Sequence, residues 1–136
     1  MRRGQAAVEY LAIVGIVLLL AAPVLIDAQQ SAGELQRASD VVVARTALDN
    51  AAEAARLVYS QGDPAQVTFT VTMPGNVIQS NVTDQYLHLR LRSPAGPIDL
   101  LSTLDFNVSG SIPTSRGQHA LVAKAVNQTN VSITPS

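Results

Sequence analysis

The sequence contains no cysteine and no tryptophan, and its only lysine is Lys124. Without cysteine, neither a disulfide framework nor a metal site built on thiolates can form. Charged residues make up only 14% of the 136 residues, which is well below the share of roughly 25% in a typical soluble domain. Because few charges are available to keep the surface soluble, we expect much of it to be covered, either in a polymer or by sugar.

Signs of an enzyme or of a nucleic-acid surface are also missing. The formal net charge is −1, and no run of Lys and Arg provides a specific nucleic-acid surface. His88 and His119 are the only histidines, and neither belongs to a close cluster with metal-ligand spacing. Arg90 and Arg92 are predicted to share a strand face with His88 and can touch a carbohydrate or a phosphate there, although a plain polar sheet face is the simpler interpretation. The sequence contains no nucleophile elbow and no phosphate loop, so we predict neither an enzyme nor a cofactor or metal site.

The N-terminal segment is basic and then apolar. Arg2 and Arg3 are followed by an uncharged run from Tyr10 to Ile26. This run is longer than the apolar core of an ordinary secretory signal, which is followed by a small-residue cleavage site. About 20 apolar residues span a hydrocarbon core as a helix. The two arginines hold the short N-terminus on the cytoplasmic side, so the sequence predicts a precursor that crosses the cell membrane once.

Glu9 lies within this apolar segment. A lone carboxylate inside a membrane costs several kcal/mol and usually marks a function with a partner. Cutting the chain between Gly4 and Gln5 creates such a partner, because the new α-amino group of Gln5 lies one helical turn from Glu9, and the same group of a neighbouring subunit can also reach it. In the simpler alternative, the segment is a plain signal anchor whose carboxylate reaches the membrane surface.

The sequence GQAAVE at residues 4–9, with its basic leader and the apolar run that follows, resembles the class III signal peptide of archaeal type IV pilin-like proteins. The family usually has Ser where this chain has Ala7, and a lysine-bearing leader where it has Arg2 and Arg3. The resemblance implies that a prepilin peptidase cuts after Gly4 and leaves the apolar helix on the mature chain. It further implies that a membrane assembly machinery builds identical subunits into a helical homopolymer, an adhesive pilus outside the cell.

Two other functions remain open beside that of a pilus subunit. The same plan can display a solute-binding domain or serve as a minor filament protein, although the scarcity of aromatic residues, at 4%, provides few platforms for stacking on sugars. The chain can also be an archaellin-type subunit of a motility filament. In the resemblance, archaellins lack the Gln-x-x-x-Glu pairing that Gln5 and Glu9 provide here.

One nearly continuous helix is predicted from Gln5 to Gln61. Its first half is apolar all round, and from Asp27 onward an apolar stripe recurs at helical spacing. The stripe consists of Val41, Leu48, Ala52, Ala55 and Tyr59. Gly62 and Pro64 end the helix. Pro23 lies inside it, and either a kink or unwound turn between Leu19 and Pro23 or a membrane helix that tolerates proline fits this position.

After Pro64 the apolar period changes to two, which indicates strands. Strands are predicted over residues 66–73, 77–82, 86–92, 119–126 and 130–134, and another is marked by Leu104, Phe106 and Val108. Short strands with polar turns favour a small antiparallel sheet or sandwich packed on the helix stripe. The fold class is therefore α+β, with a cleaved leader (1–4), a long helix (5–61) and a β-rich outer domain (62–136).

The β-rich part contains four Asn-x-Ser/Thr motifs, at Asn81, Asn107, Asn127 and Asn130. This motif is the acceptor for N-linked glycans on extracellular chains, and four is more than the Ser and Thr content predicts. The strand phases place Asn81, Asn107 and Asn130 outward. We expect N-glycosylation at these sites, while the alternative, in which they are ordinary polar residues of a sheet surface, stays open.

Overall fold

The computed structural model describes the backbone of residues 2–136 and the side chains from residue 4 onward. The side chains of Arg2 and Arg3, from which the cytoplasmic N-terminus is predicted, lie outside the described residues. One helix precedes seven strands. The elements are α1 (Arg2–Gln61), β1 (Gln66–Met73), β2 (Val77–Thr83), β3 (Tyr86–Leu91), β4 (Ile98–Thr103), β5 (Asn107–Gly110), β6 (Gly117–Asn127) and β7 (Asn130–Pro135). This order confirms the α+β class with a long N-terminal helix.

By packing, the chain divides into two units, Met1–Arg37 and Ala38–Ser136. In the first unit the backbone is helical from Arg2 onward and continues through Pro23. Residues 19–23 therefore contain no unwound turn, because all of them are helical. A kink at Pro23 stays a prediction. The division falls within the helix, because the helix residues from Ala38 onward pack with the strands. The boundary predicted after residue 61 stays a prediction.

In the second unit, the helix buries a broad face of mostly small side chains. The buried residues are Ala44, Ala47, Leu48, Ala51, Ala52, Ala54, Ala55 and Val58. Alanine adds little bulk and has the best helix propensity, so this face is buried against the sheet without breaking the helix. Of the predicted stripe, Leu48, Ala52 and Ala55 are buried, Val41 is half-buried and Tyr59 is 38% exposed.

Val58, not Tyr59, is the last buried side chain of the helix. The helical period predicted that the apolar stripe ends at Tyr59, which is one residue beyond the last buried position. The ring of Tyr59 instead stacks on that of Phe106, with 4.2 Å between ring centroids and an angle of 8° between planes. The helix ends where predicted. The Gly62 N–H donates to the Val58 carbonyl at 3.0 Å, and Gly62 has a φ of 73°, the left-handed cap geometry for which glycine is favoured.

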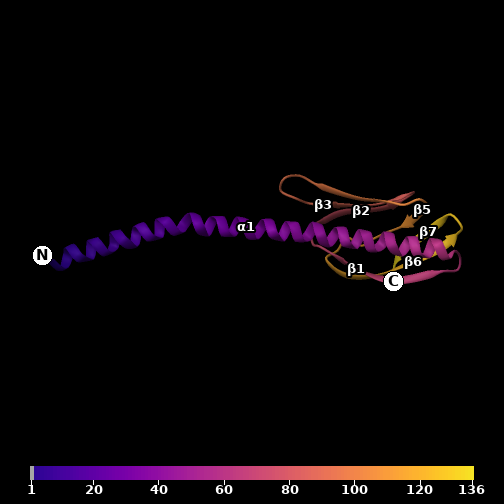
Figure 1. Ribbon diagram of the computed structural model, residues 1–136, viewed down its shortest axis with the longest axis horizontal. Coiled ribbons are helices and arrows are strands. Elements are labelled where there is room, and N and C mark those ends of the chain that lie inside the picture. The colour runs from indigo at the N-terminus through magenta and orange to yellow at the C-terminus, as the bar shows by residue number, and fades with distance from the viewer. Residues whose placement is uncertain (1) are drawn as a thin grey trace. The chain divides into compact units, whose positions relative to one another are not determined.

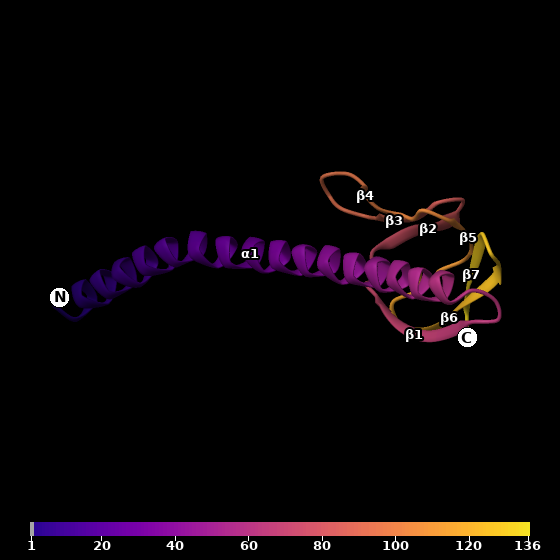
Figure 2. The same ribbon diagram turned by 45° about the vertical axis from the view of Figure 1, so that its right-hand side comes forward.

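The seven strands form a single sheet in the order β1-β6-β7-β5-β2-β3-β4. Neighbours are antiparallel except β5 and β7, which are parallel. The sheet curls around the helix of this unit, with β1 and β6 on one side of it and β2 and β3 on the other (Figures 1 and 2). The predicted antiparallel sheet packed on the helix is therefore confirmed, apart from its one parallel pair.

The strand predictions hold for β1, β2, β3, β6 and β7 to within two residues, but one strand was missed and another misplaced. The missed strand is β4, at Ile98–Thr103. Leu104 and Phe106, predicted to lie in a strand, are buried in the connection between β4 and β5, and only Val108 of that group is in a strand. Leu104 and Phe106 therefore alternate with polar residues because they are buried in this connection, and not because they belong to a strand of the sheet.

Leu48 has the largest fully buried side chain that the helix contributes to the core. We expect Leu48→Ala to lower the free energy of unfolding of the outer domain by about 2–5 kcal/mol, because it removes buried apolar surface and leaves a cavity. Urea unfolding of the chain in detergent, followed by circular dichroism, measures this. Leu57→Ala is the matched control on the same helix, since Leu57 is 46% exposed and its truncation should cost much less. Equal losses from the two substitutions would contradict the placement of the core.

Candidate functional site

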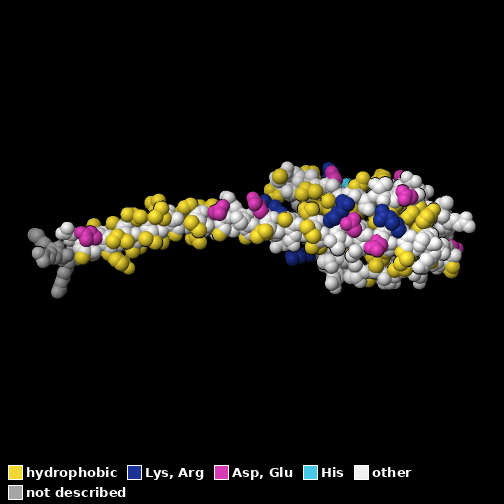
Figure 3. Space-filling view, in the orientation of Figure 1, with side chains coloured by type: hydrophobic (Ala, Val, Ile, Leu, Met, Phe, Trp, Pro, Cys, Tyr) yellow, Lys and Arg dark blue, Asp and Glu magenta, His cyan; other side chains and the backbone are white. Residues whose placement is uncertain are grey.

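The N-terminal part of α1 carries a continuous exposed apolar surface. Within Gly4–Gln61 the helix is long and apolar enough to cross a membrane, and none of its most apolar stretch is buried. Figure 3 shows hydrophobic side chains all along this part of the helix. They include Val8, Leu11, Ile13, Ile16, Val17, Leu18, Leu19, Leu20, Val24, Leu25 and Ile26, each at least 58% exposed. Such a helix fits a membrane anchor or a signal sequence.

Gly4, Gln5 and Glu9 lie together at the start of this surface. All three are helical and exposed, and Gln5 and Glu9 are four residues apart, so their side chains share one helix face. The nitrogen of Gln5 is part of a peptide bond in the uncut chain, so the predicted ammonium–carboxylate pair can form only after cleavage. A Cβ atom built on Gly4 meets nothing within 4 Å, so the fold itself does not require a glycine there.

The four sequons lie in the β-rich part of the chain. In two of them the hydroxyl of the motif's threonine donates to its asparagine. The Thr83 hydroxyl donates to Asn81 Oδ1 at 2.9 Å. Asn127 Oδ1 accepts both the Thr129 N–H at 3.0 Å and the Thr129 hydroxyl at 3.1 Å. Asn81, Asn107 and Asn127 are exposed, while Asn130 is half-buried. The predicted outward phase of Asn81, Asn107 and Asn130 agrees with this burial, since each alternates with a buried valine.

A polar cluster on β3 and β4 is the part of the surface that sequence reasoning missed. Asp99 Oδ1 lies 2.9 Å from His88 Nε2 and 3.2 Å from Arg90 Nε. The Arg90 Nε–H is not aimed at the carboxylate, so this second contact is an ion pair without a hydrogen bond. Register places Arg90 opposite Asp99. Asp99 was overlooked because β4, which carries it, was not predicted.

His119 has a local structural partner. Its Nε2–H donates to the Ser115 carbonyl at 2.7 Å, and the same nitrogen lies 3.3 Å from the Ser115 hydroxyl. The histidine therefore closes the loop that precedes β6. Neither histidine lies in a group of three or more His, Cys, Asp or Glu that could hold a metal ion, among the residues whose side chains the structure describes.

An open cleft of about 410 Å³ lies over β2 and the hairpin between β3 and β4. It is lined by Ile78, Gln79, Arg90, Arg92, Ser93 and Pro97. Arg90 and Arg92 both line this mostly apolar cleft. Arg92 lies just beyond the end of β3, and the predicted sharing of one strand face with His88 stays a prediction. The cleft lies over the sheet surface rather than within the core. It contains no pair of groups arranged for acid–base or nucleophilic chemistry.

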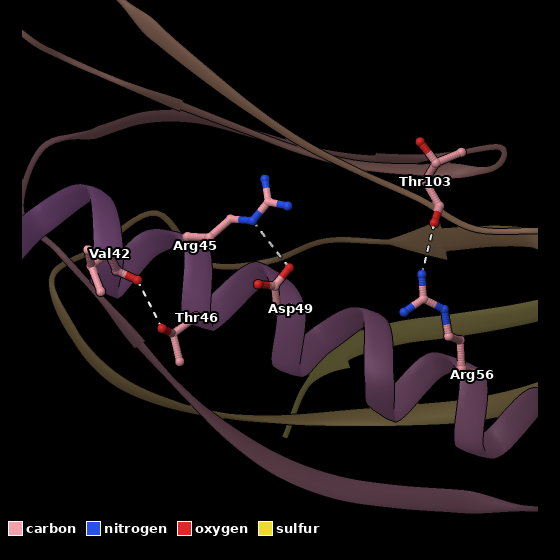
Figure 4. A network of polar contacts seen from close by, with 6 residues as sticks. All are labelled: Val42, Arg45, Thr46, Asp49, Arg56 and Thr103. Atoms are coloured by element: carbon pink, nitrogen blue, oxygen red, sulfur yellow. Dashed lines mark hydrogen bonds and ion pairs between the residues drawn. The ribbon is translucent and has the colours of Figure 1, made fainter.

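The helix is fastened to the strands at its C-terminal end by a polar contact as well as by the core. Arg56 Nη2 donates to the Thr103 carbonyl at the end of β4, at 3.1 Å (Figure 4). On the same helix, Arg45 Nε lies 3.4 Å from Asp49 Oδ1, and the Thr46 hydroxyl donates to the Val42 carbonyl at 2.9 Å. Arg56 thus gives the edge strand β4 a bond to the helix in addition to its pairing with β3.

Comparison with known proteins provides no relative from which to carry over a function. No family model matches the chain, and neither a curated protein nor a solved structure matches it. The functional argument therefore depends on the residues and on the geometry described above.

Proposed function

We propose that this protein is the structural subunit of an archaeal type IV pilus-like surface filament, made as a precursor with a four-residue leader. The observation that carries the proposal is the exposed apolar part of α1, which contains a single carboxylate, Glu9, near its start. The most apolar stretch of this helix buries none of its surface within its own unit. The surface must therefore meet something outside the chain.

Two surroundings would cover the apolar side chains, and Glu9 discriminates between them. Burying one large apolar side chain contributes about 1.5–3 kcal/mol, and both a lipid bilayer and a bundle of neighbouring helices provide this. A carboxylate is costly in lipid. In a bundle of processed chains it meets the ammonium of Gln5, from its own or a neighbouring subunit. In this proposal the membrane covers the apolar helix of the precursor, and the filament core covers the same helix in the mature subunit.

The outer domain supports the extracellular part of the proposal. Its sequons are those of a chain that carries N-linked glycans, and sugar would compensate for the low share of charged residues on its surface. We propose that the domain faces outward from the filament and mediates adhesion. Its partners are then identical subunits, the prepilin peptidase, the membrane assembly machinery and the glycan-transferring enzymes.

The proposal is tested by electron microscopy of filaments sheared from cells that make the protein. We expect helical filaments whose subunit is identified as this chain by mass spectrometry of tryptic peptides. Deletion of the gene should remove those filaments, and a plasmid copy should restore them. If the chain is found only as single molecules in the membrane fraction, it is a plain anchored protein and the filament proposal is wrong.

Processing provides an independent prediction. The mature chain should begin at Gln5, and Gly4→Val should leave the precursor uncut, because a branched side chain prevents close approach of the scissile peptide to the protease. A Cβ at Gly4 meets nothing within 4 Å, so we expect no folding defect. Gly15→Ala is the control, since Gly15 also has nothing within 4 Å and this variant should be cut normally. N-terminal sequencing decides the matter, and a mature chain beginning at Met1 or near Ser31 would contradict the prediction.

A further inference from the structure

Three of the four sequon asparagines form one row across the sheet. In the parallel pair β5–β7, Asn107 lies opposite Asn130, and in the hairpin β6–β7, Asn130 lies opposite Asn127. Neighbouring strands lie about 4.7–4.9 Å apart, so the three side chains lie close together. A register shift directly precedes Asn127, and Asn127 is exposed, as Asn107 is. The row (Asn107, Asn130, Asn127) thus places three potential acceptors side by side, although Asn107 precedes Asn127 by 20 residues and Asn130 by 23 in the sequence.

The three members of the row have different surroundings. Asn127 is exposed and lies at the hairpin turn, where its Oδ1 accepts the Thr129 N–H. A backbone N–H can only donate, so the bonded atom is the oxygen, and Nδ2, the atom that receives a sugar, is turned away from Thr129. Asn130 is half-buried, and its Oδ1 is buried without a hydrogen-bond partner among the described residues. Asn107 is exposed, but its N–H is bonded to the Thr129 carbonyl at 3.1 Å.

The fourth acceptor, Asn81, is separate from the row. It lies on β2, opposite His88 of β3. The pairing of Val82 with Gly110 fixes the register between β2 and β5, and it places Asn81 four residues along the strand from the level of Asn107. At about 3.3 Å per residue this is about 13 Å. A sugar on Asn81 therefore need not crowd one on the row.

Transfer of a glycan sets a geometric demand on the acceptor. Asparagine Nδ2 attacks the anomeric carbon of a sugar carried on a lipid phosphate. The N–C bond forms, the C–O bond to the phosphate breaks, the lipid phosphate leaves with the bonding electrons, and Nδ2 gives one proton to a base of the transferase. To reach the transferase, the acceptor segment must leave the protein surface. Asn127 has one strand partner, Asn130, and Asn81 has one, His88, so each gives up a single pairing when it moves out. Asn130 is paired on both sides, with Asn127 and with Asn107, and must open two ladders first. Asn107 must give up its pairing with Asn130 and the bond from its N–H to the Thr129 carbonyl.

From this geometry we propose that the folded domain accepts glycans at Asn127 and at Asn81, and that the row carries one glycan at a time. A sugar ring attached at Asn127 occupies the space over Asn130, because the two strands are no farther apart than about the width of the ring. Asn130, flanked on both sides and half-buried, is the acceptor that the folded domain excludes. This inference rests on the proposed glycosylation and deepens it.

The test is site-resolved mass spectrometry of the full chain isolated from cells that make it, together with its intact mass. We expect high occupancy at Asn81 and Asn127. Occupancy at Asn130 should be lower than at these sites by a factor of about ten or more, because modification there requires local opening. Molecules with two glycans in the row should be rarer than the product of the single-site occupancies. The occupancy of Asn81 should be independent of the row.

Two matched substitutions test the exclusion directly. Thr129→Ala removes the motif at Asn127 but keeps that asparagine and the backbone carbonyl bonded to Asn107, so we expect occupancy of Asn107 to rise. Thr83→Ala removes the motif at Asn81 and should leave the row unchanged. If glycans are found equally at all four sites, with two or three in one row, the inference is wrong while glycosylation stands. Unchanged occupancy of Asn107 in Thr129→Ala also overturns the exclusion, and a chain with no glycan at any site overturns both proposals.

Discussion

Glu9→Ala is expected to leave synthesis, membrane insertion and leader cleavage largely intact and to reduce filaments strongly. In the core of the proposed filament water would be scarce, so the ammonium of Gln5 and the carboxylate of Glu9 would stabilise each other. Removing one partner of a buried pair costs about 3–5 kcal/mol. A single subunit in the membrane avoids this cost, because the terminus of its helix can reach the headgroup region. The loss should therefore fall on assembly, and counting filaments by electron microscopy against the amount of cleaved subunit measures it.

Two further substitutions separate charge from shape and from general effects on the helix. Glu9→Gln keeps the shape and removes the charge, so it should resemble Glu9→Ala if pairing matters more than packing. Glu34→Ala removes another exposed carboxylate from the same unit and should leave filament numbers nearly unchanged. Normal filament numbers in both Glu9 variants would show that this residue is only an interfacial side chain of a plain anchor.

Gly110→Ala is expected to prevent the outer domain from folding, or to destabilise it by about 4 kcal/mol or more, the range reserved for clashes and buried defects. Gly110 ends β5 beside Ile133 of β7. A Cβ built on it overlaps the Ile133 carbonyl oxygen and lies 2.8 Å from the carbonyl carbon. Both neighbours are backbone atoms of a strand, and they cannot move aside without breaking the β5–β7 pairing.

Gly117 provides an unusually close control for this substitution. Its φ is 127°, against 128° for Gly110, but a Cβ at Gly117 meets nothing within 4 Å. Gly117→Ala therefore has the conformational cost without the clash, and we expect a loss of about 1–3 kcal/mol. Urea unfolding of the two variants in detergent compares them. Equal destabilisation would mean that the backbone conformation, and not the close approach of β5 and β7, makes Gly110 necessary.

The sequence predicted well those elements whose signal is local. The alternation from Gln66 to Met73 predicted β1 with its exact bounds, and Gly62 with Pro64 predicted the end of α1. Strand β4 was not predicted because Leu100 and Leu101 are adjacent, which breaks the apolar period of two. It is also an edge strand, which has a neighbour on one side only. Leu104 and Phe106 show the reverse error, since they alternate without pairing.

The residues of the candidate site were predicted individually, but their grouping was not. Nothing local relates Asn107 to Asn130, because the parallel pairing of β5 with β7 brings them together across the whole of β6. In the same way, Asp99 joins His88 and Arg90 only through the pairing of β3 with β4. Such groupings depend on strand order, which a single sequence without local turn signals does not specify. Gln5 and Glu9 are the exception, since helical spacing alone relates them.

The face of small side chains on α1 from Ala44 to Val58 would also determine how the domain resists tension in the proposed filament. Tension applied to the N-terminal part of α1 passes along the backbone to this face, which lies within the curled sheet. Force along the helix axis shears the whole face at once, because the buried residues are spread over four turns. The hydrogen bond from Arg56 to Thr103 adds its resistance at the far end. The domain is thus held to its helix in the direction in which many weak contacts must break together.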